Sequence, residues 1–385
     1  MEDVTVRLPA LPSEPLADEI AEVAQRLRLA ERYRELDRVP EFPRAEFRAL
    51  GEARLLGLHV APALGGRGLS LPRVAATLFH LAYRGGTVFA KLSLQPEFSS
   101  IIAEHGSPDL VHRYFRPLVR GEVLVANQLT EPDAGADAGA IALRLERSGE
   151  EYVLHGTKSE AAFAQDADAA IVYGRVGDGP GLTALVVPQD LPGIRRTVIP
   201  DLGERWMRRG TVTYEATRVP VSMRIGEEGR AFDYVRPELT RERALLAAIY
   251  LGVARASWEE TVRYADERSV FGGPLARNEA VSFPLVEDWA GAEASYLYAL
   301  RTLERFEAGE RVEAEAALAK WMSTEIALRT IDHAIQFHGG RGYSETLAHG
   351  QRWRDVRSGP IAHGPSEVLH LVAARRIWKA PRERV

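Results

Sequence analysis

The segment NQLTEPDAGADAGA, residues 127–140, combines residue types that suit the binding of a phosphate group. Thr130 offers a hydroxyl, while Gly135, Ala136 and Gly139 leave backbone N–H groups accessible to a closely approaching ligand such as a pyrophosphate. On composition alone, a Gly- and Asp-rich connection between two strands is the more common explanation of such a stretch. The segment is therefore a candidate binding loop, and its assignment depends on finding complementary groups in other segments.

Two segments nearer the C-terminus offer complementary groups. In YADERSVFGG, Arg268 and Phe271 are three residues apart, which predicts that both face the same way on the last turn of a helix, where they would suit a phosphate and an adenine ring. A solvated arginine and a core phenylalanine are the simpler alternative. In IQFHGGRGY, Gly339 is expected to end a helix. The additional Gly340, together with Gln336, favours contact between the backbone and a flat ligand.

A candidate acid–base group lies further upstream, at Glu242. Apolar residues stand three positions before it and three, four and seven positions after it, namely Leu239, Leu245, Leu246 and Ile249. This spacing places the Glu242 carboxylate on the apolar face of a helix. Burying a carboxylate is costly unless it is paired or functional. The residues alone favour a salt bridge to an arginine over catalysis.

The hydrophobic pattern predicts which elements position these groups. Residues 1–122 are expected to be all-helical, residues 123–230 to form short strands of an antiparallel barrel or sandwich, and residues 231–385 to form a helical bundle, which gives an α+β fold. Seven strand-like runs are separated by Gly, Pro and Asp. In the helix before the Gly339 stop, the predicted buried face consists of Leu318, Trp321, Leu328, Ile331 and Ile335.

Composition excludes several classes of protein. The 385-residue chain has a formal charge of −5, which argues against nucleic acid or an anionic membrane as a partner. It has no cysteine, so disulfides, thiolate metal sites and a cysteine nucleophile are excluded, and its ten histidines form no HExxH pattern. No metal is expected. Because neither a signal peptide nor a long apolar segment is evident, we expect a cytoplasmic protein.

The order and spacing of TEPDAGAD, RSVFG, QFHGGRGY and RWRD resemble those of the acyl-CoA dehydrogenase family along almost the whole chain. The resemblance implies bound FAD, a homotetramer or homodimer, and α,β-oxidation of an acyl thioester of CoA or of an acyl carrier protein, with an electron-transfer flavoprotein as acceptor. It also implies the cofactor contacts, carried over by position. These are Leu129, Thr130, Gly135, Ala136, Ala162, Arg268, Phe271, Gln336, Gly339 and Gly340.

The position of the catalytic base departs from most of the family. Most members carry a glutamate before the last helix, in a motif where this chain has Ala362, His363 and Gly364. His363 is thus a candidate catalytic residue. As a neutral imidazole near a helix N-terminus it would act as a base or merely fill the vacated volume, and we favour the second role.

A minority of the family, resembling the isovaleryl- and long-chain-specific enzymes, carries the base on an earlier helix. There the glutamate stands directly before an arginine and ten residues before a glycine, as do Glu242, Arg243 and Gly252 in this chain. The resemblance therefore implies Glu242 as the base and Arg243 as a contact to the thioester ligand.

A second departure concerns the flavin contacts. After Lys158 the family has an aromatic and then a hydroxyl residue, whereas this chain reads Glu160, Ala161 and Ala162, and Ala136 replaces a serine. Each lost hydrogen bond costs about 0.5–3 kcal/mol, which FAD binding can survive. Two alternatives stay open: a flavin-dependent monooxygenase on the same scaffold, and a non-catalytic protein that binds acyl-CoA or flavin.

Overall fold

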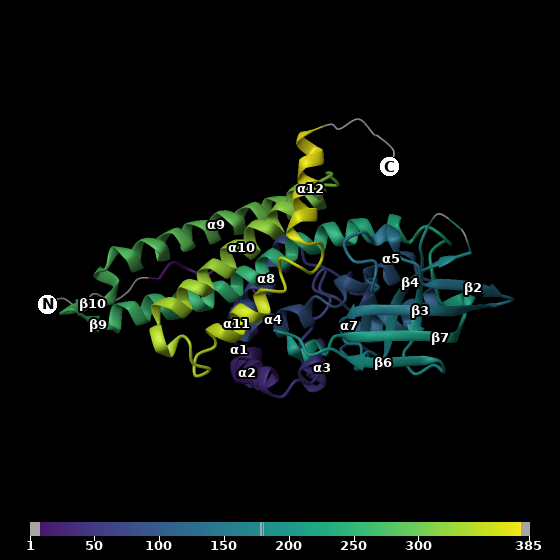
Figure 1. Ribbon diagram of the computed structural model, residues 1–385, viewed down its shortest axis with the longest axis horizontal. Coiled ribbons are helices and arrows are strands. Elements are labelled where there is room, and N and C mark those ends of the chain that lie inside the picture. The colour runs from purple at the N-terminus through teal and green to yellow at the C-terminus, as the bar shows by residue number, and fades with distance from the viewer. Residues whose placement is uncertain (1–7, 178, 180, 379–385) are drawn as a thin grey trace. The chain divides into compact units, whose positions relative to one another are not determined.

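The computed structural model describes residues 8–177, 179 and 181–378, which fall into two compact units (Figure 1). We call them the helical unit, residues 1–37, 70–91 and 243–385, and the sheet unit, residues 38–69 and 92–242. Helices at the N-terminus, a central sheet and helices at the C-terminus confirm the predicted α+β class. The domain bounds predicted at residues 122 and 230 remain predictions. None of the helices within the described ranges is long and apolar enough to cross a membrane.

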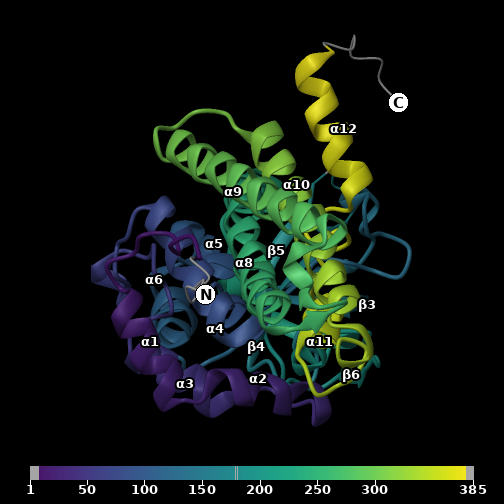
Figure 2. The ribbon, with the colours of Figure 1, turned by 90° about the vertical axis from the view of Figure 1, so that its left-hand side faces the viewer.

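The helical unit is built around α10 (Glu313–Phe337), which packs against α9 (Glu279–Glu307), α11 (His349–Val356) and α12 (Ser366–Ile377) (Figure 2). Ala247 of α8 (Ala231–Glu267), Ala299 of α9 and Ala319 of α10 form one buried cluster. Small side chains at these positions allow the three helices to approach closely. The buried side of α10 thus differs from the predicted one. Five large residues were expected on that side, and only Ile331 among them is fully buried.

The remaining helices of this unit are α1 (Ala17–Arg26), α2 (Leu29–Arg38) and α4 (Leu71–Ser93). α4 is interrupted at Gly85–Gly86, where Gly86 has φ 65° and ψ −162°. A Cβ at Gly86 would lie 2.4 Å from the ring of Tyr33, so only glycine fits here. The Tyr33 hydroxyl donates a hydrogen bond of 2.6 Å to Asp355, which ties α2 to α11.

The sheet unit contains α3 (Arg44–Glu52), α5 (Ser100–His105), α6 (Pro108–Leu110), α7 (Arg116–Val119) and an eight-stranded sheet in the order β6-β7-β3-β2-β4-β5-β8, with β1 beside β4. Its strands are β1 (Val125–Gln128), β2 (Arg144–Ser148), β3 (Glu151–Ala161), β4 (Ala169–Val176), β5 (Thr183–Pro188), β6 (Ile194–Val198), β7 (Gly210–Pro220) and β8 (Arg224–Ile225). Most neighbours are antiparallel, whereas β4 pairs in parallel with β1 and β2. The sequence pattern missed β6, because this partly exposed edge strand carries two arginines and lacks an apolar alternation.

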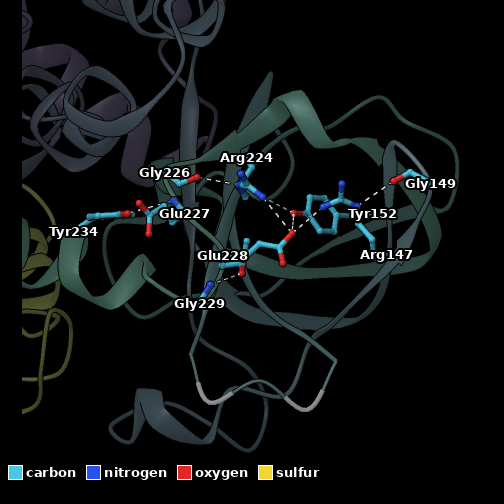
Figure 3. A network of polar contacts seen from close by, with 10 residues as sticks. Arg147, Gly149, Tyr152, Arg224, Gly226, Glu227, Glu228, Gly229 and Tyr234 are labelled. Carbon is cyan, nitrogen blue, oxygen red and sulfur yellow. Dashed lines mark hydrogen bonds and ion pairs between the residues drawn. The ribbon is translucent and has the colours of Figure 1, made fainter.

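The turn that leads from β8 into α8 is fixed to the β2–β3 hairpin (Figure 3). Glu228 accepts hydrogen bonds from Arg147 at 2.9 Å, from Arg224 at 3.1 Å and from the Tyr152 hydroxyl. The Tyr152 hydrogen bond, although opposed by burial, helps to lower the pKa of Glu228. Because α8 starts three residues later, this network holds the first turns of the helix that carries Glu242.

Candidate functional site

A buried ion pair anchors the candidate binding loop to the sheet. Lys158 of β3 lies 2.8 Å from Glu131, and Glu131 also accepts hydrogen bonds from the backbone N–H groups of Ala142 and Leu143 at 2.8 and 2.9 Å. Burial lowers the pKa of Lys158 to about 8, although Glu131 acts in the opposite direction. In the sequence, Lys158 served only to locate the positions of the flavin contacts that follow it. In the structure, this side chain fixes the candidate binding loop.

The predicted contacts in this loop lie next to the end of β3. Lys158 Nζ donates 2.9 Å to the carbonyl of Leu129, and the N–H of Ser159 donates 3.0 Å to the carbonyl of Thr130. Gly135 and Ala136 are exposed. A Cβ at Gly135 would touch nothing closer than the Thr130 methyl group at 4.0 Å. The loop therefore offers open backbone to a ligand, as the sequence predicts.

The replaced flavin contacts lie at the irregular end of the same strand. Glu160 adopts a left-handed φ of 53° and forms an ion pair of 3.2 Å with Arg209. Ala161 is buried and Ala162 is half-buried. The next residue, Phe163, is buried, and its ring lies 5.6 Å from the ring of Trp206, which is also buried. Segment 160–162 therefore supplies a charge and two methyl groups in place of a ring and a hydroxyl.

Arg268 and Phe271 do not share a helical turn, contrary to the prediction. α8 ends at Glu267, and Arg268 leads into a hairpin of β9 (Ser269–Val270) and β10 (Gly273–Pro274). Phe271 and Gly272 form its turn with φ 48° and 86°, and positive φ at both central residues is what a tight two-residue hairpin turn requires. The Phe271 side chain is fully exposed at 107%. Arg268 is exposed at the base of this hairpin, where its carbonyl accepts a hydrogen bond from the N–H of Leu275, whereas Phe271 lies at the turn.

The glycine turn after α10 is open, as predicted. α10 ends at Phe337, and Gly339 follows with φ 58°, which confirms it as the stop signal. A Cβ at Gly339 or Gly340 would meet no atom within 4 Å, and Gln336 is exposed. The His338 ring stacks on Tyr264 near the end of α8 at 4.3 Å. The turn and the Arg268–Phe271 hairpin therefore belong to the same end of the helical unit.

A buried polar network that sequence reasoning missed supports this turn. His349 hydrogen-bonds Ser257 at 3.2 Å, and its ring lies 4.6 Å from that of His338. Burial, and then the charge of Arg352, lower the pKa of His349 to about 4. Arg352 donates two hydrogen bonds, of 2.8 and 2.9 Å, to Glu260. The imidazole is neutral at physiological pH, so it supports the turn by packing.

Glu242 is a buried carboxylate, as its apolar neighbours predict. Its relative exposure is 2%, and Leu245 and Ile249 are fully buried beside it on α8. Gly252, ten residues on, permits close helix packing, because a Cβ there would lie 2.4 Å from the carbonyl of Phe79 in α4. Close packing between α8 and α4 thus explains why this chain has glycine at position 252, the glycine position of the minority motif.

His363 lies in a turn whose backbone carbonyl groups accept hydrogen bonds from two basic side chains. Lys320 of α10 donates 2.7 Å to the Gly364 carbonyl and also contacts the Ala362 carbonyl, while Arg243 Nε donates 3.0 Å to the His363 carbonyl. His363 itself has φ 54°. Burial, then Arg243, lower the pKa of Lys320 to about 7. Sequence reasoning missed Lys320, although a lone lysine in an Ala-rich helix is a signal.

The residues fit an extended dinucleotide cofactor with a pyrophosphate. Open backbone occurs at Gly135, Gly339 and Gly340, and Arg268 and Phe271 are exposed at the base and the turn of one hairpin. Only segment 160–162 lacks the expected groups.

Among known proteins, three family models match this chain: the acyl-CoA dehydrogenase N-terminal domain at residues 13–122, the middle domain at 126–217 and the C-terminal domain at 229–378. The chain belongs to the acyl-CoA dehydrogenase family, and is thus an FAD-dependent oxidoreductase acting on CH–CH bonds.

Individual relatives cover nearly all of the chain. Benzylmalonyl-CoA dehydrogenase of Aromatoleum aromaticum is 34% identical over 359 residues, which are 91% of this chain and 94% of that protein. The acyl-CoA dehydrogenase structure from Geobacillus kaustophilus has a TM-score of 0.89 at 25% identity, covering 96% of this chain and 100% of that one. A chain in the structure of the electron transferring flavoprotein of Acidaminococcus fermentans has a TM-score of 0.90 at 25% identity, covering 94% and 97%.

Proposed function

We propose that this protein dehydrogenates an acyl-CoA thioester between its α and β carbons, with Glu242 as the base that removes the α-proton. The observation that carries this proposal is the burial of Glu242, which is 2% exposed and directly precedes Arg243 on α8. A buried carboxylate is costly unless it is paired or functional, and the resemblance to the minority of the family gives this one a function.

In the proposed reaction, Glu242 takes the α-proton and the β-hydrogen leaves as hydride, so that a carbon–carbon double bond forms and the substrate loses two electrons. FAD, when bound, supplies the hydride acceptor at N5. Arg243 would bind and orient the thioester ligand. Its guanidinium already donates to the His363 carbonyl, which fixes its direction within the helical unit.

We assign His363 a structural role in this scheme. Its carbonyl is used by Arg243, and the carbonyls on either side are used by Lys320. These contacts explain the conformation of the turn without any catalytic demand on the imidazole. The side chain would fill the volume of the glutamate found there in most of the family.

The cofactor contacts that we propose are those that the resemblance implies, and each unit is described separately. In the sheet unit they are Leu129, Thr130, Gly135, Ala136 and Ala162, and in the helical unit Arg268, Phe271, Gln336, Gly339 and Gly340. The full exposure of Phe271 supports a contact outside its own chain. We therefore propose a homotetramer or homodimer in which Arg268 and Phe271 reach the FAD of another subunit.

The relatives support our proposals for the substrate and the electron acceptor. The name of the Aromatoleum relative supports a CoA thioester as substrate, with an acyl carrier protein thioester as the alternative carrier. The structural neighbour from an electron transferring flavoprotein supports that kind of protein as the acceptor. The cytoplasm is the proposed location.

The decisive experiment is anaerobic bleaching of the flavin absorption by a panel of acyl-CoA esters. Glu242→Gln should abolish bleaching while FAD stays bound, whereas His363→Ala should retain most of it. Equal loss in both variants would overturn the assignment of the base. Rapid reoxidation by air with a hydroxylated product would instead favour a monooxygenase, and absence of flavin after loading with FAD would favour a non-catalytic binding protein.

A further inference from the structure

Glu160 stands next to the cofactor contacts that we propose for the sheet unit. The N–H of Ser159 donates 3.0 Å to the carbonyl of Thr130 in the candidate binding loop. Glu160 directly follows Ser159, and Ala162 stands two positions further along the chain. Thr130 and Ala162 are both proposed contacts of FAD. A charged side chain therefore occurs within one or two residues of groups that would meet the cofactor.

The irregular end of β3 keeps this side chain accessible. The pairing of β3 with β7 shifts its register between Lys158 and Ala161, and Glu160 has a left-handed φ of 53°. A residue other than glycine keeps this conformation only where its surroundings hold it there. Ala161 is buried, whereas the side chain of Glu160 is 49% exposed. The carboxylate thus lies outside the core of the sheet.

One guanidinium serves two carboxylates at this position. Arg209 Nη1 lies 3.2 Å from Glu160 Oε2, while Arg209 Nε donates 2.9 Å to Asp201 and its Nη2 contacts the same Asp201 carboxylate. The Asp201 side chain is 9% exposed. Two parallel hydrogen bonds make the pair with Asp201 the stronger one. Glu160 is held in place by Arg209, but these three groups together carry one net negative charge.

The basic side chains next in sequence have carboxylates of their own. Lys158 lies 2.8 Å from Glu131, and Arg208 lies 2.8 Å from Asp166. Each of these pairs is balanced in itself. Neither pair supplies a cation that would offset the Glu160 carboxylate.

A carboxylate at this position has an electrostatic consequence for a flavin. Acceptance of a hydride adds one negative charge to the cofactor. A fixed anion close by opposes that gain, and the repulsion strengthens where the bound ligand displaces water. The aromatic residue that the resemblance implies at this position has no charge and exerts no such repulsion. The exchange of an aromatic residue for Glu160 therefore bears on reduction more than on binding of the oxidised cofactor.

We propose that the Glu160 carboxylate, held in place by Arg209, lowers the reduction potential of bound FAD. This inference rests on the FAD contacts of the proposed function and is independent of the role of Glu242. A lower potential makes the oxidised cofactor a weaker acceptor of hydride from the substrate. It also makes the reduced cofactor a stronger donor to the electron acceptor.

The reduction potential of the FAD-loaded protein, measured without substrate by reductive titration against a reference dye, tests the proposal. Glu160→Gln removes the charge with little change in size, so it should shift the potential to a more positive value. Glu160→Asp retains the charge and should stay close to the wild type. An unchanged potential in Glu160→Gln, or an equal shift in Glu160→Asp, would overturn the proposal.

Glu151→Gln is the matched control. Glu151 lies at the other end of β3, where its exposed carboxylate pairs with Arg218 at 2.9 Å. Its removal deletes the same charge from the same strand, far along the chain from the proposed contacts, and should leave the potential unchanged. A shift equal to that of Glu160→Gln would mean that the effect reports only the total charge of the protein, which would refute a local role.

Arg209→Gln tests the sign of the effect. Removal of the cation should move the potential in the opposite direction, to a more negative value, because both carboxylates then lack their counter-charge. Shifts in the same direction for Glu160→Gln and Arg209→Gln would indicate a general distortion of the site and would overturn the electrostatic explanation.

The measurement separates failure of this inference from failure of the proposed function. Retention of FAD with no shift in Glu160→Gln would refute the inference alone. Bleaching that persists in Glu242→Gln would refute the base, while the shift in potential is still expected. Absence of bound FAD from the wild type after loading would overturn both.

Discussion

The side-chain nitrogen of Lys320 lies 2.7 Å from the carbonyl oxygen of Gly364, so a fully buried lysine of α10 holds the turn that carries His363. Lys320→Met should destabilise the protein at neutral pH, because each buried carbonyl left without a donor costs about 1–3 kcal/mol. Urea unfolding measures this loss. Arg301→Met, an exposed change on α9, is the control and should leave stability nearly unchanged.

The pH dependence of this contact has a definite sign. The pKa of Lys320 is about 7 in the folded chain against 10.5 in the unfolded one, so between these values the unfolded chain binds more protons. Stability should therefore rise with pH from about 7 to about 10.5 through this group. The wild type should gain stability over this range relative to Lys320→Met, and parallel curves for the two proteins would contradict the assignment.

Glu131→Gln should destabilise the sheet unit by about 3–5 kcal/mol, because it leaves the buried ammonium of Lys158 without its counter-ion. The double variant with Lys158→Met should lose less than the two single losses combined. Chemical denaturation of the wild type, the two single variants and the double variant gives the coupling free energy between Glu131 and Lys158. Asp133→Asn, an exposed change in the same loop, is the control, and additive losses would contradict a functional ion pair.

Ala162→Thr should tighten FAD binding, because it restores a hydroxyl at the position where the family has one. The gain expected for one hydrogen bond is about 0.5–1.5 kcal/mol, or roughly two- to tenfold in Kd. Titration of the apoprotein with FAD, followed by absorption or fluorescence, measures it. Ala162→Val adds similar bulk without the hydroxyl, so equal tightening in both would refute the hydrogen-bond explanation.

Acid should destabilise the helical unit through His349. Its folded pKa of about 4 lies below the unfolded value of 6.5, so the stability that it contributes is present above pH 6.5 and is lost as pH falls toward 4. His349→Leu should therefore show a shallower loss of stability between these pH values. Thermal unfolding of both proteins across this range measures the difference, and identical slopes would exclude His349 as the titrating group.

The sequence predicted the fold class and the burial of Glu242 because both depend on apolar periodicity, which is a local signal. The same signal misled on α10, where large residues such as Trp321 were expected inside but Ala316, Ala319 and Lys320 are buried. Helices that approach closely need small side chains, and which side of α10 faces its neighbours is decided by packing. Periodicity of large residues does not contain that information.

The local geometry at the candidate site residues was predicted in part for a related reason, while their roles remain predictions. Open backbone at Gly135, Gly339 and Gly340 follows from residue type, and the structure has it. The hairpin at Phe271 was missed, because a spacing of three residues is compatible with both a helix and a tight turn. Lys320 was missed because its partners are backbone carbonyls, which no sequence motif marks.

The burial of the lysines has a practical consequence for labelling. The sequence contains four lysines, and the three within the described residues, Lys91, Lys158 and Lys320, have exposures of 4%, 0% and 0%. Amine-reactive reagents should modify these side chains only when the surrounding structure opens. The extent of acylation at each, read by mass spectrometry, would then report separately on the opening of the helical unit, through Lys91 and Lys320, and of the sheet unit, through Lys158.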